Sequence, residues 1–200
     1  MVSGEVQVGG ITNKNNIMKL LKLYGLPRSG TNLLNFLMSL NFHEYTCIFA
    51  EHNVHYLGWK HGKPSNIETI KVVERISDQC INFVFIIRSF ENWKEAILNR
   101  HLGHWEFPNH TFSEEEGELL YSTPTGYELY RNLEHLYEEY TTIYKNYAEA
   151  NPEKCILVYY EDLQKDQVKT VLQIKEKFDL SLVYENPISI IKQIQMNERL

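Results

Sequence analysis

The feature that most constrains the fold is an almost wholly apolar run at residues 81–87, INFVFII. The run is rich in β-branched and aromatic residues, and it lacks the polar alternation of a strand with one wet face. A strand of this kind is typical of a parallel sheet that is covered on both sides. We therefore expect an α/β fold in which helices pack on both faces of a central parallel sheet.

Other segments complete this pattern. Strands are predicted at residues 18–24 and 155–160, with brief candidates at 45–50 and 55–59, and helices at 31–40, 66–79, 91–100, 126–150 and 166–178. Residues 101–125 are expected to be a loose segment, with a helix start and capping box at 113–116. Residues 18–200 should form one three-layer sandwich domain, preceded by a flexible segment at 1–17. The ligand site of such a sheet lies at the carboxyl ends of its strands.

Charge and cysteine content limit the partners. The formal net charge of −6 provides no global positive field, so we expect no nucleic-acid partner, and an anionic ligand would need a local group of donors. Neither a signal-peptide run nor a membrane-spanning run is present in the sequence, so no membrane partner is expected. The odd number of cysteines, Cys47, Cys80 and Cys155, favours free thiols in a cytoplasmic protein. Nothing in the sequence indicates the oligomeric state.

A glycine-bounded loop, GLPRSGTN at residues 25–32, lies between the first predicted strand and the first predicted helix. Backbone N–H groups at a helix N-terminus favour an anion, and polar side chains in the loop add donors. The spacing from Gly25 to Gly30 fits the ATP-binding pattern G-x-x-x-x-G-K-[ST], but Thr31 stands where that pattern has lysine. The missing lysine disfavours hydrolysis of ATP or GTP.

The sequence PRSGT in this loop resembles the loop that grips the 5′-phosphosulfate in sulfotransferases that use 3′-phosphoadenosine 5′-phosphosulfate (PAPS), where P-[KR]-[ST]-G-T recurs. The arginine form resembles the bacterial and tyrosylprotein branches. The resemblance implies a P-loop-type phosphosulfate loop and a set of donor-binding residues: Pro27, Arg28, Ser29, Gly30, Thr31 and Asn32. Arg28 is also expected to act on the transferring group. Asn32 replaces the family's usual second threonine.

Two later segments resemble the same family. Arg88 ends the apolar strand, where the family grips the 3′-phosphate, and Arg100 matches a second basic residue of the tyrosylprotein branch. Ala96 stands where the family usually has serine, which removes about 1 kcal/mol of expected hydrogen bonding. The strand CILVYY continues into YEDL, which makes Tyr160 a candidate adenosine contact and gives the following acidic pair a structural role.

Two candidates remain for the base that accepts the acceptor's proton. The family's cytosolic branch has a lysine–histidine element before the 3′-phosphate strand, which implies His61 as base and Lys60 beside the sulfuryl group. The tyrosylprotein and heparan branches use a glutamate after the first helix, and Glu51 falls in that region. His52 and His55 are nearby third choices.

The resemblance implies transfer of a sulfuryl group from PAPS to a hydroxyl or amine acceptor, with a carbohydrate or other small molecule favoured. No metal is expected, since the spacing of His101, His104 and His110 fits no common zinc pattern. The alternatives are a P-loop nucleotide or small-molecule kinase and a catalytically degenerate nucleotide-binding module. The kinase would need an acidic Mg²⁺ ligand, and the apolar strand ends in Arg88 instead.

Overall fold

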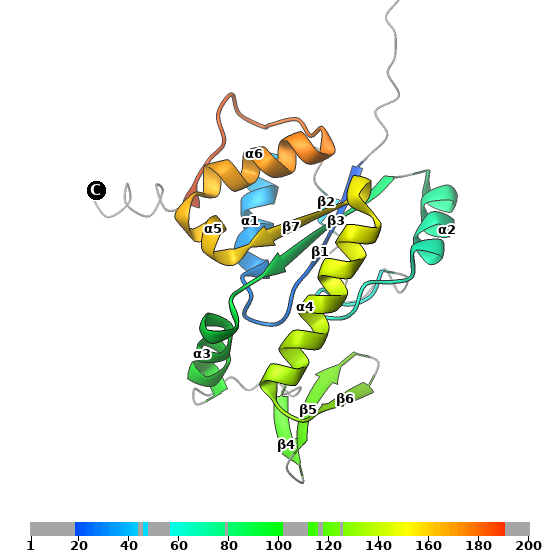
Figure 1. The fold of residues 1–200 in the computed structure, drawn as a ribbon. Helices are drawn as coiled ribbons and strands as arrows, with labels where there is room; N and C mark the ends of the chain where they lie inside the picture. Colours follow the sequence, from blue (N-terminus) through cyan, green and yellow to red (C-terminus); the bar gives the residue numbers. More distant parts are fainter. Residues whose placement is uncertain are drawn as a thin grey trace, which may run out of the picture.

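A parallel sheet forms the centre of the protein in a computed structural model that describes residues 19–43, 46–47, 57–78, 80–101, 112–115, 118–124 and 126–190. The sheet is 4-stranded, in the order β2-β1-β3-β7 (Figure 1). Its strands are β1 (Lys19–Tyr24), β2 (Thr46–Cys47), β3 (Cys80–Ile87) and β7 (Cys155–Tyr159). Each neighbouring pair runs parallel, so the carboxyl ends of the strands meet at one edge.

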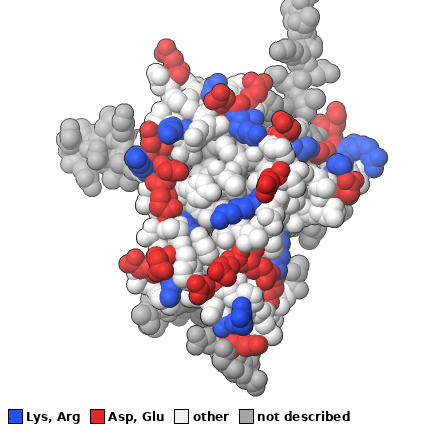
Figure 2. Space-filling model, in the orientation of Figure 1, with Lys and Arg blue, Asp and Glu red and all other residues white. Residues whose placement is uncertain are grey.

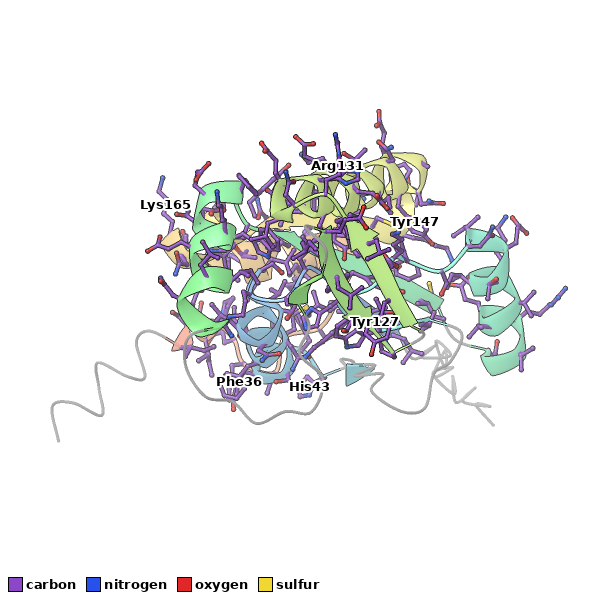
Figure 3. The ribbon with its side chains drawn as sticks, turned by 90° about the horizontal axis from the view of Figure 1, so that it is seen from below. Phe36, His43, Tyr127, Arg131, Tyr147 and Lys165 are labelled. Atoms are coloured by element: carbon purple, nitrogen blue, oxygen red, sulfur yellow. The ribbon has the colours of Figure 1, made fainter. Side chains whose placement is uncertain are left out.

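Helices connect the strands and cover both faces of the sheet. They are α1 (Thr31–Asn41), α2 (Ile67–Ser77), α3 (Phe90–His101), α4 (Leu133–Ala150), α5 (Tyr160–Lys165) and α6 (Gln167–Phe178), with a short 3₁₀ turn η1 (Pro152–Lys154) before β7. Figure 3 shows α4 on one side of the sheet and α1 on the other. The predicted α/β architecture with a central parallel sheet is confirmed. None of the described helices is long and apolar enough to cross a membrane.

Alternating side chains of the strands divide the core in two. In β1, Leu20 and Tyr24 contribute to one apolar cluster, which includes α4, whereas Leu21 and Leu23 contribute to the other, which includes α1 and α6. In β3 every residue from Ile81 onward is buried. Burying one large apolar side chain contributes about 1.5–3 kcal/mol, so β3 is a major source of stability. Its apolar run predicted this two-sided burial correctly.

The region before α4 differs from the prediction. A 3-stranded antiparallel sheet lies here, formed by β4 (Phe112–Glu115), β5 (Glu118–Thr123) and β6 (Gly126–Tyr130). The predicted capping box at 113–116 and the predicted helical start at residue 126 are therefore wrong. Leu129 matched the helical spacing of α4, but it is 60% exposed and lies on a strand. The helix begins only at Leu133, because the Asn132 side chain caps it by accepting from His135 N–H.

The segment predicted as a strand at residues 55–59 also differs. Its described part, residues 57–59, forms no strand, because its carbonyls bind side chains and a turn rather than a neighbouring strand. Residues 1–17 lie outside the described residues, so the predicted flexible segment stays a prediction. Of the predicted strand at 45–50, only residues 46–47 are described, and they form β2. Cys80 and Cys155 are free thiols, as expected, and burial raises the pKa of Cys155 to about 12.

Candidate functional site

The loop between β1 and α1 has a backbone that requires glycine at two positions. A Cβ atom at Gly25 would lie 2.6 Å from both Ile86 Cγ2 and Ser29 Oγ. At Gly30, φ is +98° and a Cβ atom would lie 2.4 Å from the Tyr160 ring. Arg28 also has a positive φ, of 68°. The glycine pair is thus explained by close packing of the loop against β3 and α5 as well as by its turn.

The N-terminus of α1 supplies backbone N–H donors next to this loop. The first N–H groups of a helix have no partner within it, and no side chain caps the first turn of α1. That turn also contains no acidic residue, so the positive end of the helix dipole faces the loop without a carboxylate to neutralise it. These two features are the ones that an anion site at a helix N-terminus requires, and anion binding by this loop stays a prediction.

Two loop side chains predicted as donors make contacts within the protein. The Ser29 hydroxyl is buried and donates to the carbonyl of Leu26 at 2.6 Å, so Ser29 stabilises the loop's shape. Asn32 is exposed, and its Oδ1 accepts from Lys60 Nζ at 3.0 Å. Thr31 is buried at the first position of α1. The Pro27 carbonyl accepts from the Trp93 indole at 2.8 Å, which joins the loop to α3.

Arg88 lies next to this loop, because β3 pairs with β1 in the sheet. Its Nη1 donates to the carbonyl of Arg28 at 3.2 Å, and its guanidinium lies 4.5 Å from the centre of the Tyr160 ring. Its Nε is buried and has no hydrogen-bond partner among the described residues. A buried donor without a partner is costly, so this nitrogen is suited to an anion that enters the site. The structure therefore brings Arg28, Arg88 and Tyr160 together.

Glu161 has the structural role that its place in YEDL predicted. Its Oε1 accepts from the Ser89 backbone at 3.0 Å, from the Ser89 hydroxyl at 2.8 Å and from Asn92 Nδ2 at 3.0 Å. Burial raises the pKa of Glu161, but hydrogen bonds from Asn92 and Ser89 outweigh burial and hold it below its ordinary value. The Ser89 hydroxyl thus donates its hydrogen to Glu161, which joins the start of α3 to α5.

Lys60 and His61 approach the same loop from a separate segment, residues 57–62, which we call the strap. Gly25 N–H donates to the Lys60 carbonyl at 2.9 Å, and His61 Nδ1 lies 2.6 Å from the Gly25 carbonyl. Adjacent residues of a strand would point to opposite faces. Here Gly62 N–H donates to the Trp59 carbonyl and forms a turn, which lets both side chains reach the loop.

The His61 contact determines which ring nitrogen can act as a base. A carbonyl oxygen only accepts, so Nδ1 must carry the hydrogen, and the neutral ring keeps its lone pair on Nε2. Burial lowers the pKa of His61 to about 3; the Gly25 bond opposes this shift, and the charges of Lys60 and Lys22 add to it. His61 is therefore neutral near pH 7, as a base must be before it accepts a proton.

The pKa of His61 leads to a prediction about acid stability. An unfolded histidine titrates near its ordinary pKa of 6.5, whereas folded His61 titrates near 3. Between these values the unfolded chain binds more protons, so the free energy of unfolding falls with falling pH by up to about 1.4 kcal/mol per pH unit. His61→Asn lacks this titration and should lose stability less steeply, as measured by urea unfolding. His43→Asn, at an exposed position, is the control, and equal slopes for wild type and His61→Asn would contradict the assignment.

A second prediction concerns Gly30. Gly30→Ala should abolish the anion site and lower the melting temperature, because its Cβ would overlap the Tyr160 ring in addition to the strain of a positive φ. The strain costs about 1–2 kcal/mol and the overlap costs more. Gly126→Ala is a matched control, since Gly126 also has a positive φ but no atom lies within 4 Å of its added Cβ. Equal losses of stability in the two variants would show that the Tyr160 contact is unimportant.

Other predicted site residues remain untested. Glu51, His52 and His55 lie outside the described residues, as do His104 and His110. Arg100 lies near the end of α3, and the structure describes only its backbone. Within the described part of the chain, no three His, Cys, Asp or Glu side chains form a group that could hold a metal ion.

Sequence reasoning missed several residues that shape the site. These are Lys22, Tyr24, Trp93, Tyr121, Tyr137 and Tyr144, all of which donate to backbone carbonyls of the loop, the strap or Arg88. Lys22 carried a usable signal, since a lysine inside an apolar strand needs a buried acceptor. The tyrosines carried none, because their spacing on β1, β5 and α4 is that of ordinary core residues.

On the face shown in Figure 2, Lys and Arg side chains are dispersed among Asp and Glu side chains and form no continuous patch. In comparisons with known proteins, no protein-family model matches this chain, and neither does any curated protein.

Proposed function

We propose that this protein is a sulfotransferase that moves a sulfuryl group from PAPS to a hydroxyl or amine acceptor, with a small molecule or carbohydrate favoured. The observation that carries the proposal is the convergence of two other segments on the PRSGT loop. Arg88 with Tyr160 and the strap with Lys60 and His61 are each in direct contact with residues 25–32. These are the segments whose sequences resemble the PAPS-dependent family.

The residues present fit the two anionic ends of the donor. The uncapped first turn of α1 and its loop, a P-loop-type binding site, would hold the 5′-phosphosulfate. Arg88 would hold the 3′-phosphate, since its Nε has no partner among the residues that the structure describes and its guanidinium lies against the Tyr160 ring. Tyr160 would thus orient Arg88 and lie beside the adenosine.

The donor supplies an activated sulfuryl group whose leaving group is a stable phosphate. His61 Nε2 would accept the proton of the acceptor hydroxyl while the oxygen of that hydroxyl forms a bond to sulfur. The bond between sulfur and the phosphate oxygen breaks, and 3′-phosphoadenosine 5′-phosphate retains that electron pair. Lys60 and Arg28 would stabilise negative charge on the transferring group. When it accepts the proton, His61 becomes positively charged. Burial disfavours this charged form, whereas the negative charge of the donor's phosphates would stabilise it.

Lys60 also bears on the kinase alternative. Its Nζ contacts Asn32 at the start of α1, so a cation reaches the loop from the strap although position 31 lacks a lysine. No acidic side chain ends β3 to hold Mg²⁺, because Arg88 stands there. A cationic site of this composition is better suited to a metal-free anionic donor.

Calorimetric titration with 3′-phosphoadenosine 5′-phosphate, without metal, tests the proposal, and ATP with Mg²⁺ is the comparison. We expect micromolar binding of the bisphosphate and little response to ATP. Preference for ATP with Mg²⁺ would overturn the proposal in favour of the kinase. Absence of binding to either would favour a degenerate module. After bisphosphate binding, incubation with PAPS and a panel of sugars, phenols and amines identifies the acceptor class.

A further inference from the structure

The strap has no regular secondary structure, yet every one of its backbone carbonyls accepts a hydrogen bond. The partners are the Tyr24 hydroxyl for Leu57, Lys22 Nζ at 2.6 Å for Gly58, Gly62 N–H at 3.0 Å for Trp59, Gly25 N–H at 2.9 Å for Lys60, the Tyr121 hydroxyl at 2.6 Å for His61, and the Tyr144 hydroxyl at 3.0 Å for Gly62. Connecting segments usually run over the surface, where water can satisfy their carbonyls. This segment is instead held at each peptide unit.

The donors come from different elements of the fold. Lys22 and Tyr24 lie on β1, Tyr121 lies on β5, and Tyr144 lies on α4. All four side chains are 0% exposed. The strap is thus anchored by the central sheet, by the antiparallel sheet and by a covering helix at once. Its position is determined by the tertiary structure rather than by its own sequence.

We infer that Tyr121 and Tyr144 are positioning residues, which hold the strap so that Lys60 and His61 face the nucleotide loop. Their hydroxyls bind the carbonyls of His61 and Gly62, adjacent to the imidazole itself. The inference rests on the proposed function for its catalytic meaning. The hydrogen bonds between the tyrosines and the strap, on which the inference depends, are present in the structure whatever nucleotide the protein binds.

The packing around the two tyrosines restricts where their hydroxyls can point. Tyr140 packs edge-on against both rings, with centroid distances of 5.6 Å to Tyr121 and 6.0 Å to Tyr144. Trp59 of the strap lies 6.1 Å from the Tyr121 ring and 4.9 Å, edge-on, from the His61 ring. The rings therefore cannot turn away without disturbing the core, and the hydroxyls remain directed at the strap.

Protonation keeps these hydroxyls as donors. Burial raises the pKa of Tyr121 and of Tyr144 well above the ordinary value, and neighbouring tyrosines and Glu128 act in the same direction. Both hydroxyls stay protonated throughout the range in which an enzyme would work. The two tyrosine hydroxyls therefore stay donors to the strap near neutral pH.

The test uses Tyr121→Phe and Tyr144→Phe, which remove one hydroxyl each and keep the ring. Tyr127→Phe is the matched control, since Tyr127 is 71% exposed on β6 (Figure 3). Nitrogen-15 NMR of histidine-labelled protein reports the tautomer and titration of His61. We expect wild type and control to show the Nδ1–H form with a strongly lowered pKa. In each test variant the pKa should rise toward its ordinary value by about one unit or more, because the ring becomes more solvated.

Calorimetry on the same proteins separates this inference from the proposed function. Affinity for 3′-phosphoadenosine 5′-phosphate should stay within about 2-fold of wild type in both variants, because the phosphate contacts lie on other residues. A wild-type protein that binds no bisphosphate would defeat the proposed function while the NMR comparison still tests the positioning. Unchanged His61 signals in both variants would overturn the positioning role, even with tight nucleotide binding.

A measurement on the wild type guards against variants that do not fold. The Nδ1–H proton of His61 should exchange slowly with solvent, since it is held between a buried carbonyl and a strap that is anchored at every peptide unit. Slow exchange supports an anchored strap. Exchange as fast as that of a surface histidine would overturn the inference without any substitution.

Discussion

Arg88→Ala is expected to weaken the binding of 3′-phosphoadenosine 5′-phosphate about 100-fold. A hydrogen bond between charged partners contributes about 1.5–3 kcal/mol, and one guanidinium can donate two such hydrogen bonds to a single phosphate. Losing the binding free energy of one such hydrogen bond and part of that of the second corresponds to the expected 100-fold loss of affinity. The substitution also removes the contact with the Arg28 carbonyl and the cation–π contact with Tyr160. Calorimetric titration measures the change directly.

Two further variants show whether the effect belongs to the site. Arg131→Ala removes an exposed arginine between β6 and α4 and should leave the affinity unchanged. Arg88→Lys keeps the charge but loses the planar pair of donors, so it should recover only part of the affinity. Wild-type affinity in Arg88→Ala would mean that the unpartnered Nε does not mark a phosphate site.

His61→Asn is expected to lower kcat by about 100-fold to 10,000-fold, which is the usual contribution of a general base. The amide nitrogen of asparagine can take the place of Nδ1 and donate to the Gly25 carbonyl, so the strap keeps this contact. The lone pair of Nε2 is lost. Nucleotide affinity should therefore change little while turnover falls, and assays of sulfuryl transfer with an acceptor from the screen measure both.

The competing base is tested in parallel. Glu51→Gln should leave kcat near the wild-type value if His61 accepts the proton. A large loss in Glu51→Gln, together with near-normal turnover in His61→Asn, would reverse the assignment. His43→Asn, at an exposed position, controls for a general effect of replacing a histidine.

Much of the fold was predictable because its signals are local. The strand–loop–helix around Gly25 and Gly30, the strand that ends in Arg88, and the strand that leads into Tyr160 all follow from apolar runs and turn residues. Parallel strands bring their carboxyl ends to one edge, so the proximity of Arg88 to the loop followed from the fold class. The antiparallel sheet was missed because Leu129 continues the helical spacing of α4, and spacing alone cannot place a helix start.

By itself, the sequence determined the α/β class with its central parallel sheet, and it singled out Lys60 and Arg88, which lie beside the loop. Only the tertiary structure decided how these groups face one another. The strap carbonyls bind buried donors on β1, β5 and α4, far apart along the chain, and burial in this setting lowers the pKa of His61. Burial and long-range hydrogen bonds have no local pattern in a sequence. For that reason the sequence could nominate His61 as a base, but only the structure shows that its Nδ1 contacts the Gly25 carbonyl, which leaves the lone pair on Nε2.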